Sequence, residues 1–194
     1  MMTKAEHCLE VVLKATERCN INCTYCYVFN KGNDSYLSKP KRMSARTASE
    51  IGMFVRRSAE ASDIASVRFI FHGGEPLMLS KAEFRAVCDA LIEGVGNAIK
   101  VGFTIQTNAM LVDEEWIDIL SHYRFGVGVS LDGPREINDL TRVDHKGQGT
   151  YDRVLVGIRK LQAAAQVGKL SRPGVLCVIN PRLDGAEMLR HFVL

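Results

Sequence analysis

The chain lacks a long apolar run and an excess of one charge. Its 194 residues include 25 lysines and arginines against 22 aspartates and glutamates, a net charge of +3. A membrane span needs about 20 consecutive apolar residues, and a charge this small does not by itself indicate a nucleic-acid partner. The residues before Leu9 are polar and do not resemble a secretory signal. We therefore expect a cytoplasmic protein with no membrane and no nucleic-acid partner, and the basic run 39–42 is interpreted as a solvated loop.

No repeat or low-complexity segment divides the sequence. Hydrophobic residues make up 46% and charged residues 24%, as in ordinary globular proteins. The length suits one domain with a substantial core, which we expect to cover residues 1–194. Six cysteines without a secretory signal favour a reducing compartment, where thiols stay free.

Five short stretches rich in β-branched or aromatic residues predict strands, at 9–15, 67–72, 101–106, 125–131 and 175–179. Helical patterns separate them and begin at Ser44 or Thr47, and at Ser80, Asp113, Thr150 and Asp184. Strands that alternate with single helices indicate an α/β fold with a parallel sheet. About five βα units are present, so the pattern predicts a partial (β/α) TIM-like barrel.

Two of the six cysteines are assigned to the core. Cys88 lies on an apolar stripe of helical spacing that follows the capping box Ser80–Glu83 and ends at Ile92. Cys177 falls in the middle of the fifth predicted strand. Neither position has the surroundings of a metal ligand.

The other informative cysteines are Cys19, Cys23 and Cys26, spaced C-x3-C-x2-C after the first strand. Three thiolates can hold three corners of a four-iron cluster and leave the fourth iron open to a small molecule. A zinc site is the weaker interpretation because no fourth ligand follows nearby. A disulfide framework leaves one cysteine over, and a redox protein that uses the last two cysteines does not explain Cys19.

Polar or glycine-rich clusters follow three further strands. They are His72-Gly73-Gly74-Glu75-Pro76, Gln106-Thr107-Asn108, and Ser130-Leu131-Asp132-Gly133-Pro134 with Arg142 beyond it. Singly, each has an ordinary structural interpretation: a turn at the glycines, a cap at Ser130 or Asp132, a surface arginine and a core histidine. The carboxyl ends of parallel strands meet at one edge, so we expect these clusters to converge on one site.

Together these motifs resemble those of a known family, the radical S-adenosylmethionine (radical SAM) enzymes. The cysteine spacing with Tyr25 before the last cysteine resembles the family signature, and Gly73-Gly74-Glu75-Pro76 resembles its glycine-rich motif. The later clusters resemble the SPASM-type branch of peptide and anaerobic sulfatase maturases. The resemblance runs from about residue 12 to residue 179. His72 stands where sulfatase maturases often have glutamine, so the substrate stays open.

The resemblance implies a mechanism and its cofactors. One [4Fe–4S] cluster, held by Cys19, Cys23 and Cys26, and S-adenosylmethionine together yield methionine and a 5′-deoxyadenosyl radical, which abstracts hydrogen from a peptide or protein substrate. An external one-electron donor of the flavodoxin or ferredoxin type reduces the cluster.

The implied cofactor contacts fall on eight residues. Tyr25 faces the adenine through its backbone, Gly74 accepts from the ammonium with Gly73 and Glu75 shaping the turn, and Ser130 and Arg142 hold the ribose and the carboxylate. Asn108 and Asp132 belong to the same clusters without a fixed role, and Val178 and Ile179 pack near the adenine.

The sequence departs from the family pattern in one further respect. It ends before the last barrel strand and before any auxiliary-cluster cysteine, so we expect a radical SAM core without a SPASM domain and with no catalytic proton acceptor of its own. The alternative function is a catalytically incomplete, cluster-binding half-barrel that needs a partner or a further segment.

Overall fold

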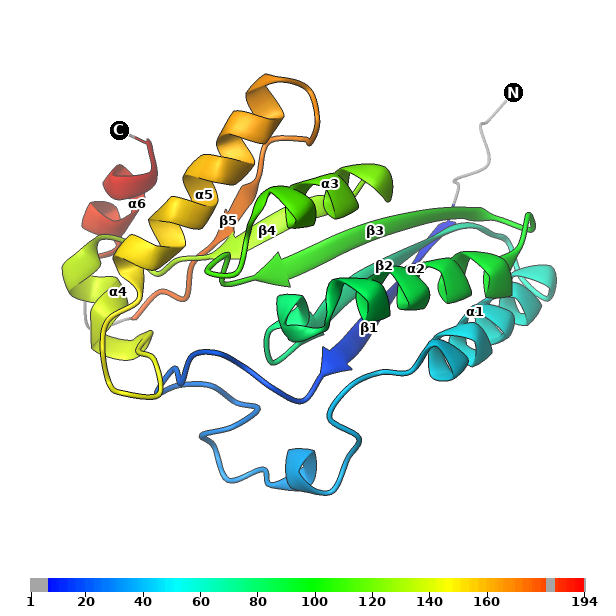
Figure 1. Cartoon of the computed structure of the whole chain (residues 1–194), viewed down its shortest axis with the longest axis horizontal. Helices are drawn as coiled ribbons and strands as arrows, with labels where there is room; N and C mark the ends of the chain where they lie inside the picture. The colour runs from blue at the N-terminus through cyan, green and yellow to red at the C-terminus, as the bar shows by residue number, and fades with distance from the viewer. Residues whose placement is uncertain (1–6, 181–183, 194) are drawn as a thin grey trace.

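The structure, a computed structural model, describes residues 7–180 and 184–193. Its centre is a sheet of five parallel strands whose order in the sheet equals their order in the chain. The strands are β1 (His7–Thr16), β2 (Ile64–Gly73), β3 (Lys100–Thr107), β4 (Gly126–Ser130) and β5 (Gly174–Leu176), shown in Figure 1. The α/β prediction of a partial barrel with about five units is confirmed.

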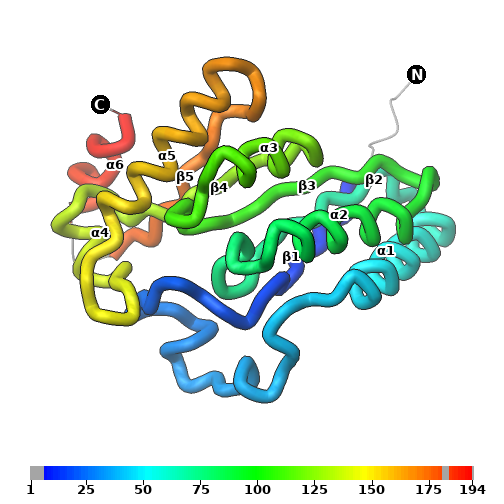
Figure 2. The backbone as a smooth tube through the Cα atoms, viewed as in Figure 1, coloured from blue at the N-terminus to red at the C-terminus, as the bar shows by residue number. Residues whose placement is uncertain are grey.

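Helices connect successive strands. Figures 1 and 2 show α1 and α2 running side by side. None of the helices in the described ranges is long and apolar enough to cross a membrane. The helices are α1 (Ala45–Glu60), α2 (Lys81–Val95), α3 (Glu114–His122), α4 (Arg135–Thr141), α5 (Tyr151–Gln166) and α6 (Gly185–Val193), with short 3-10 turns η1 (Ser35–Leu37) and η2 (Pro76–Met78).

Side chains alternate between the two faces of the strands. In β2, Val67, Phe69 and Phe71 are buried, whereas Arg68 is exposed and His72 is half-buried. Strands β3 and β4 repeat this alternation. One face therefore carries the apolar core, and the other presents polar side chains at the strand ends.

Aromatic rings fill the core between the sheet and two helices. The ring of Phe71 lies 5.0 Å from that of Phe84 in α2, and Phe84 lies 5.1 Å from Trp116 in α3. Phe103 of β3 stacks on Phe125 at 5.1 Å. Each such pair adds about 0.5–1.5 kcal/mol beyond the area it buries, so the cluster fixes α2 and α3 against the strands whose ends carry the motifs.

The helix starts confirm the predicted caps. The Ser44 side chain accepts a hydrogen bond from Thr47 N, which makes Ser44 the N-cap of α1. Ser80 and Glu83 form the expected capping box of α2. Cys88 is fully buried, as predicted.

Three expectations about elements are wrong. The fifth strand ends at Leu176, because β5 lies at the edge of the described sheet and pairs only with β4. Cys177 therefore lies beyond the strand and is half-buried, not part of the core. Ile92, the last residue of the apolar stripe, is 39% exposed because the stripe drifts around the helix beyond its contact with the sheet. Helix α4 was not expected, since it has seven residues and no side-chain cap.

Candidate functional site

A cavity lies at the carboxyl ends of the strands, where parallel α/β folds bind ligands. The four clusters selected from the sequence all line it. Its walls include Cys19, Cys23, Tyr25, Cys26, Gly73, Gly74, Glu75, Asn108, Ser130, Asp132 and Arg142. The structure thus brings together the three cysteines and the eight residues expected to contact the cofactor, and Val178 with them, whereas Ile179 lines only an adjoining cavity.

The cysteine loop is anchored on one side by the glycine turn after β2. Gly74 N donates to Thr16 O (2.8 Å) and Glu75 N donates to Arg18 O (2.7 Å), which continues the parallel pairing beyond β1. A Cβ atom on Gly74 would lie 2.0 Å from Arg18 O. The glycine is therefore required by the close approach of the cysteine loop itself, a reason that the sequence did not indicate.

The other side of the loop is anchored by the end of α4 and the residues that follow it. Asn22 N donates to Val143 O (2.7 Å), and Thr24 N donates to Thr141 O (2.9 Å). The Asn108 side chain reaches from the end of β3 and donates to Asn20 Oδ1 (2.7 Å). The loop is thus held by three distant segments before any cofactor binds.

The thiols and their spacing suit an iron–sulfur cluster. Burial raises the pKa of Cys19 to about 12 and also raises that of Cys23, where Arg142 opposes the shift. Such thiols lose their protons when metal replaces them. Among the described residues, no three His, Cys, Asp or Glu side chains form a group that could hold one metal ion. In a four-iron cluster each thiolate binds a different iron, so the three thiols need not meet at a single ion.

Glu75 holds the ends of β2 and β3 together. It is 1% exposed. Its Oε1 accepts from Leu77 N (3.1 Å) and Thr107 Oγ1 (2.7 Å), and its Oε2 accepts from Asn108 N (2.7 Å). Burial raises the pKa of Glu75, and these hydrogen bonds oppose that shift. Both carboxylate oxygens bind protein donors, so the geometry assigns this side chain to the architecture of the turn.

A hydrogen-bonded chain of three side chains crosses the cavity. Tyr25 Oη donates to Asp132 Oδ2 (2.6 Å) and accepts from Arg142 Nη1 (2.9 Å). Asp132 Oδ1 accepts from Val178 N (3.0 Å). The Tyr25 side chain therefore links the cysteine loop to the segments that follow β4, α4 and β5.

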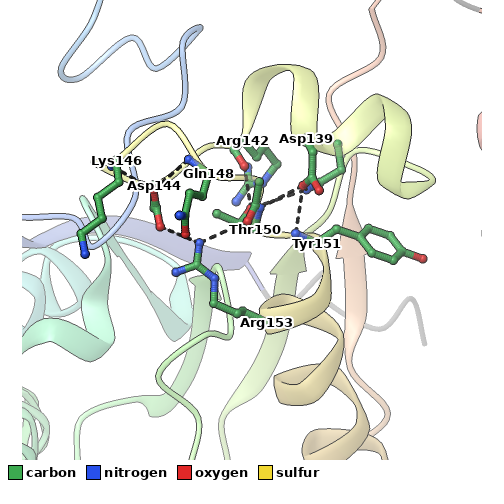
Figure 3. Close-up of polar contacts among 10 residues, drawn as sticks. Asp139, Arg142, Asp144, Lys146, Gln148, Thr150, Tyr151 and Arg153 are labelled. Atoms are coloured by element: carbon green, nitrogen blue, oxygen red, sulfur yellow. Dashed lines mark hydrogen bonds and ion pairs between the residues drawn. The ribbon is translucent and has the colours of Figure 1, made fainter.

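The main chain of Arg142 is fixed by the start of α5. Thr150 Oγ1 donates to Arg142 O (2.7 Å), and Asp139 Oδ1 accepts from Thr150 N (2.9 Å) and Tyr151 N (3.0 Å). Figure 3 shows these contacts beside the turn that follows Arg142. The arginine is held at its backbone and at its tip.

The turn itself is organised around one carboxylate. Asp144 accepts from the backbone N–H groups of Lys146 (2.9 Å) and Gln148 (3.0 Å). Arg153 of α5 donates to the second Asp144 oxygen (2.8 Å). These contacts, also drawn in Figure 3, give the turn a defined shape next to the cysteine loop.

Arg142 lines the cavity, and one donor of its guanidinium group has no partner among the described residues. The residue is 6% exposed, and its buried Nε atom has no hydrogen-bond partner. An unpaired buried donor costs about 1–3 kcal/mol, and more if charged. A guanidinium is shaped to bind a carboxylate. The cavity therefore suits a ligand that carries a carboxylate.

The remaining walls are less strongly charged. Gln106 Nε2 donates to Ser130 Oγ (2.7 Å). Burial lowers the pKa of the half-buried His72, so its ring is neutral near pH 7. Val178 and Ile179 line an adjoining apolar cavity, and Val178 also faces the main one.

Several supporting residues were missed from the sequence. Asn20, Asn138, Thr150 and His145 contact the proposed site residues through single hydrogen bonds. Asn20 lies in the cysteine loop, whereas Asn138, His145 and Thr150 depend on α4 and the turn after it, and that helix gives no clear sequence pattern. The signal that could have found them is the polar character of residues 138–150, most of which are not apolar.

Known proteins share both the sequence and the fold. A family model described as the Radical SAM superfamily matches residues 13–177. The cysteine-type anaerobic sulfatase-maturating enzyme of Clostridium perfringens (strain 13) is 29% identical over 89% of this chain and 44% of its own length. The serine-type enzyme of Bacteroides thetaiotaomicron is 31% identical over 74% of this chain and 34% of its own length.

Solved structures give the same match. Histidine-tagged anSMEcpe with bound AdoMet aligns with a TM-score of 0.79 and 25% identity, over 96% of this chain and 48% of that one. Native anSMEcpe with bound AdoMet and Kp18Cys peptide aligns with a TM-score of 0.75 and 26% identity, over the same shares of the two chains. The chain thus spans less than half the length of these relatives. The family match, the fold and the converging motifs agree: this chain belongs to the Radical SAM superfamily.

Proposed function

We propose that this chain binds a [4Fe–4S] cluster through Cys19, Cys23 and Cys26 and S-adenosylmethionine beside it, and that it modifies a peptide or protein side chain. The observation that carries the proposal is the cavity where the three cysteines, the glycine turn and Arg142 meet. Together, the reduced cluster and S-adenosylmethionine supply a 5′-deoxyadenosyl radical and methionine, and the radical abstracts a hydrogen atom from the substrate.

The protein's own residues divide the binding work. Arg142 offers its guanidinium to the methionine carboxylate; Tyr25 holds the tip of that guanidinium, and Thr150 holds the Arg142 backbone carbonyl. The backbone around Gly73 and Gly74 lines the cavity and accepts from the ammonium. Ser130, braced by Gln106, faces the ribose. Asn108 and Glu75 stabilise the loop that presents the cysteines, and Asp132 orients Tyr25.

The substrate class is a peptide or protein side chain. The relatives include a cysteine-type and a serine-type sulfatase-maturating enzyme, and one relative was solved with a bound peptide. His72 lines the same cavity as the cysteines, and we assign it a contact with the reacting side chain. The cavity favours neither cysteine nor serine as the reacting residue, and analysis of the modified peptide identifies which one reacts.

Two further parts of the proposal follow from the chemistry. The reductive step needs one electron, which we assign to an external flavodoxin or ferredoxin. A cluster with an open iron also needs a reducing environment, so we assign the protein to the cytoplasm. We also assign the chain to a radical SAM core domain, which the family match over residues 13–177 supports.

The test is anaerobic reconstitution of the full chain with iron and sulfide, followed by dithionite and S-adenosylmethionine. We expect about four irons per chain and formation of 5′-deoxyadenosine. Cys23→Ala should lose the visible absorbance of the cluster, whereas Cys8→Ala, at an exposed position of β1, should keep it. Iron binding without 5′-deoxyadenosine would support the alternative, a cluster-binding half-barrel that is catalytically incomplete.

The Arg142 role has its own test. Arg142→Ala should keep the iron content but weaken S-adenosylmethionine binding by at least tenfold, as expected for losing a charge-assisted contact of about 1.5–3 kcal/mol. The matched control is Arg135→Ala, which removes an exposed arginine paired with Asp152. Unchanged affinity in Arg142→Ala would refute the carboxylate assignment.

A further inference from the structure

We propose that the basic surface outside the cysteine loop is the docking face for an acidic one-electron donor protein. The face is formed by residues 17–44 and by the turn 143–149. The inference rests on the proposed function, because a cluster that cleaves S-adenosylmethionine must receive an electron. It adds the place where that electron enters.

A second cavity reaches the cysteine loop away from the strand ends. It shares Cys19, Ile21 and Phe29 with the main cavity. Its other walls come from the same loop, from Tyr36 of η1 and from His145, and none comes from the ends of β2 to β5. A partner at this cavity therefore approaches Cys19 without occupying the space for S-adenosylmethionine or substrate.

An exposed side chain connects this cavity to the first cysteine. His145 Nε2 lies 2.9 Å from Cys19 O, and the ring nitrogen must donate because a carbonyl oxygen only accepts. His145 is exposed on its other side. An electron-donor protein that contacts the His145 ring is therefore separated by only that side chain from the main chain of Cys19, a proposed cluster ligand.

The surface around the cavity is positively charged. Residues 17–44 and 143–149 together contain six lysines and arginines and three carboxylates. Their local net charge of +3 equals that of the whole chain. Two of the carboxylates are already paired, Glu17 with Lys14 and Asp144 with Arg153. Four exposed lysines have no ion pair in the described structure: Lys31, Lys39, Lys41 and Lys146. Only Asp34 opposes them.

The basic run 39–42 is an exposed loop before α1, as expected, and its backbone is in addition fixed in place. Lys41 O accepts from Thr16 Oγ1 (2.8 Å) and from Glu17 N (3.0 Å). Arg42 pairs with Thr16 in an antiparallel bridge. The lysines are therefore presented from a backbone tied to the residues just before Cys19, and their charge acts at a defined place.

Exposed apolar side chains complete the face. Leu37 of η1 is 68% exposed on this face, and Tyr27, directly after Cys26, is 73% exposed and also lines the main cavity. A few aromatic or aliphatic anchors within a charged rim are the usual composition of a protein–protein interface. The rim charges would mainly speed the encounter with an acidic partner, as a transient electron-transfer complex requires.

The experiment compares two triple charge reversals on the full, reconstituted chain. Lys31→Glu, Lys39→Glu and Lys41→Glu together alter the proposed face. Arg57→Glu, Lys100→Glu and Arg172→Glu make the same charge change near the opposite end of the strands, where the cations are also exposed. Cluster bleaching is followed by stopped flow without S-adenosylmethionine, with reduced flavodoxin or dithionite as the reductant.

We expect the face variant to be reduced by flavodoxin at least tenfold more slowly in 50 mM salt, within the range of about 10–10³ for electrostatic steering. High salt should narrow the difference, and dithionite should reduce both variants at similar rates. Equal rates with flavodoxin, or equal slowing in the control variant, would overturn the inference.

A failure of the docking inference can be distinguished from a failure of the proposed function. Dithionite and S-adenosylmethionine test 5′-deoxyadenosine formation without a protein donor. Calorimetric titration of oxidised flavodoxin onto the chain tests docking even if that reaction fails. Binding that is lost in the face variant and kept in the control supports the docking face, and undetectable or equal binding contradicts it.

Discussion

The contact between Gly74 and the cysteine loop yields a quantitative prediction for Gly74→Ala. The new Cβ would lie 2.0 Å from Arg18 O and 2.4 Å from Arg18 C. The atoms in contact belong to the backbone, so no side-chain rotation relieves the overlap, and the loop must move by roughly 1 Å. That movement also breaks the 2.7 Å hydrogen bond from Glu75 N to Arg18 O.

The expected cost combines two effects. Overpacking costs about 1–3 kcal/mol, and the lost backbone hydrogen bond about 1 kcal/mol. The sum of about 2–4 kcal/mol corresponds to a fall in Tm of about 4–16 °C for a domain of this size. Because Cys19 directly follows Arg18, the variant should also bind less iron on reconstitution.

The assay is thermal unfolding of the chain without iron, together with iron content after reconstitution. Gly102→Ala is the matched control, since its Cβ would meet nothing closer than Val67 O at 3.8 Å. A Gly→Ala change without strain is neutral or stabilises by about 0.4–1 kcal/mol. If Gly74→Ala melts and binds iron like the Gly102→Ala protein, the loop is not held by this contact, and the reasoning is refuted.

Three further substitutions test the packing and polar contacts. Glu75→Gln replaces one carboxylate oxygen by an NH2 group, so either Leu77 N–H or Asn108 N–H loses its acceptor. The unpaired donor should lower the free energy of unfolding by about 1–3 kcal/mol, measured by urea titration. Unchanged stability would contradict the architectural role. Tyr25→Phe removes the acceptor of Arg142 Nη1 and should weaken S-adenosylmethionine binding in calorimetry while iron content is kept; equal affinity would show that the guanidinium needs no support. Phe71→Ala should destabilise the chain by about 3–5 kcal/mol, and a smaller loss would mean that the aromatic core collapses around the gap.

Much of the fold follows from local patterns in the sequence. The buried alternation of Val67, Phe69 and Phe71 marks β2, and the Ser80–Glu83 capping box marks the start of α2. These patterns are local because strand burial and helix caps are decided by nearby residues. The fifth strand was predicted too long for the opposite reason: its pairing depends on a neighbour, and β5 pairs only with β4 in the described sheet.

The site could be located from the sequence but not explained. Parallel topology alone places the ends of β1 to β4 at one edge, so the convergence of the clusters was predictable. The function of Glu75 as a tie to Thr107 and Asn108 was not, because it depends on the distance between two strand ends. The same is true of Tyr25, whose hydroxyl meets residues far along the chain.

The sequential order of the strands has a consequence for synthesis on the ribosome. Each βα unit adds to the edge left by the previous one, so the sheet can grow as the chain emerges. The cysteine loop is the exception, since its anchors at Gly74, Asn108 and Val143 are translated long after Cys26. The three thiols therefore lack their full set of anchors until residue 143 has been translated, and metal delivery belongs to the stage after that point.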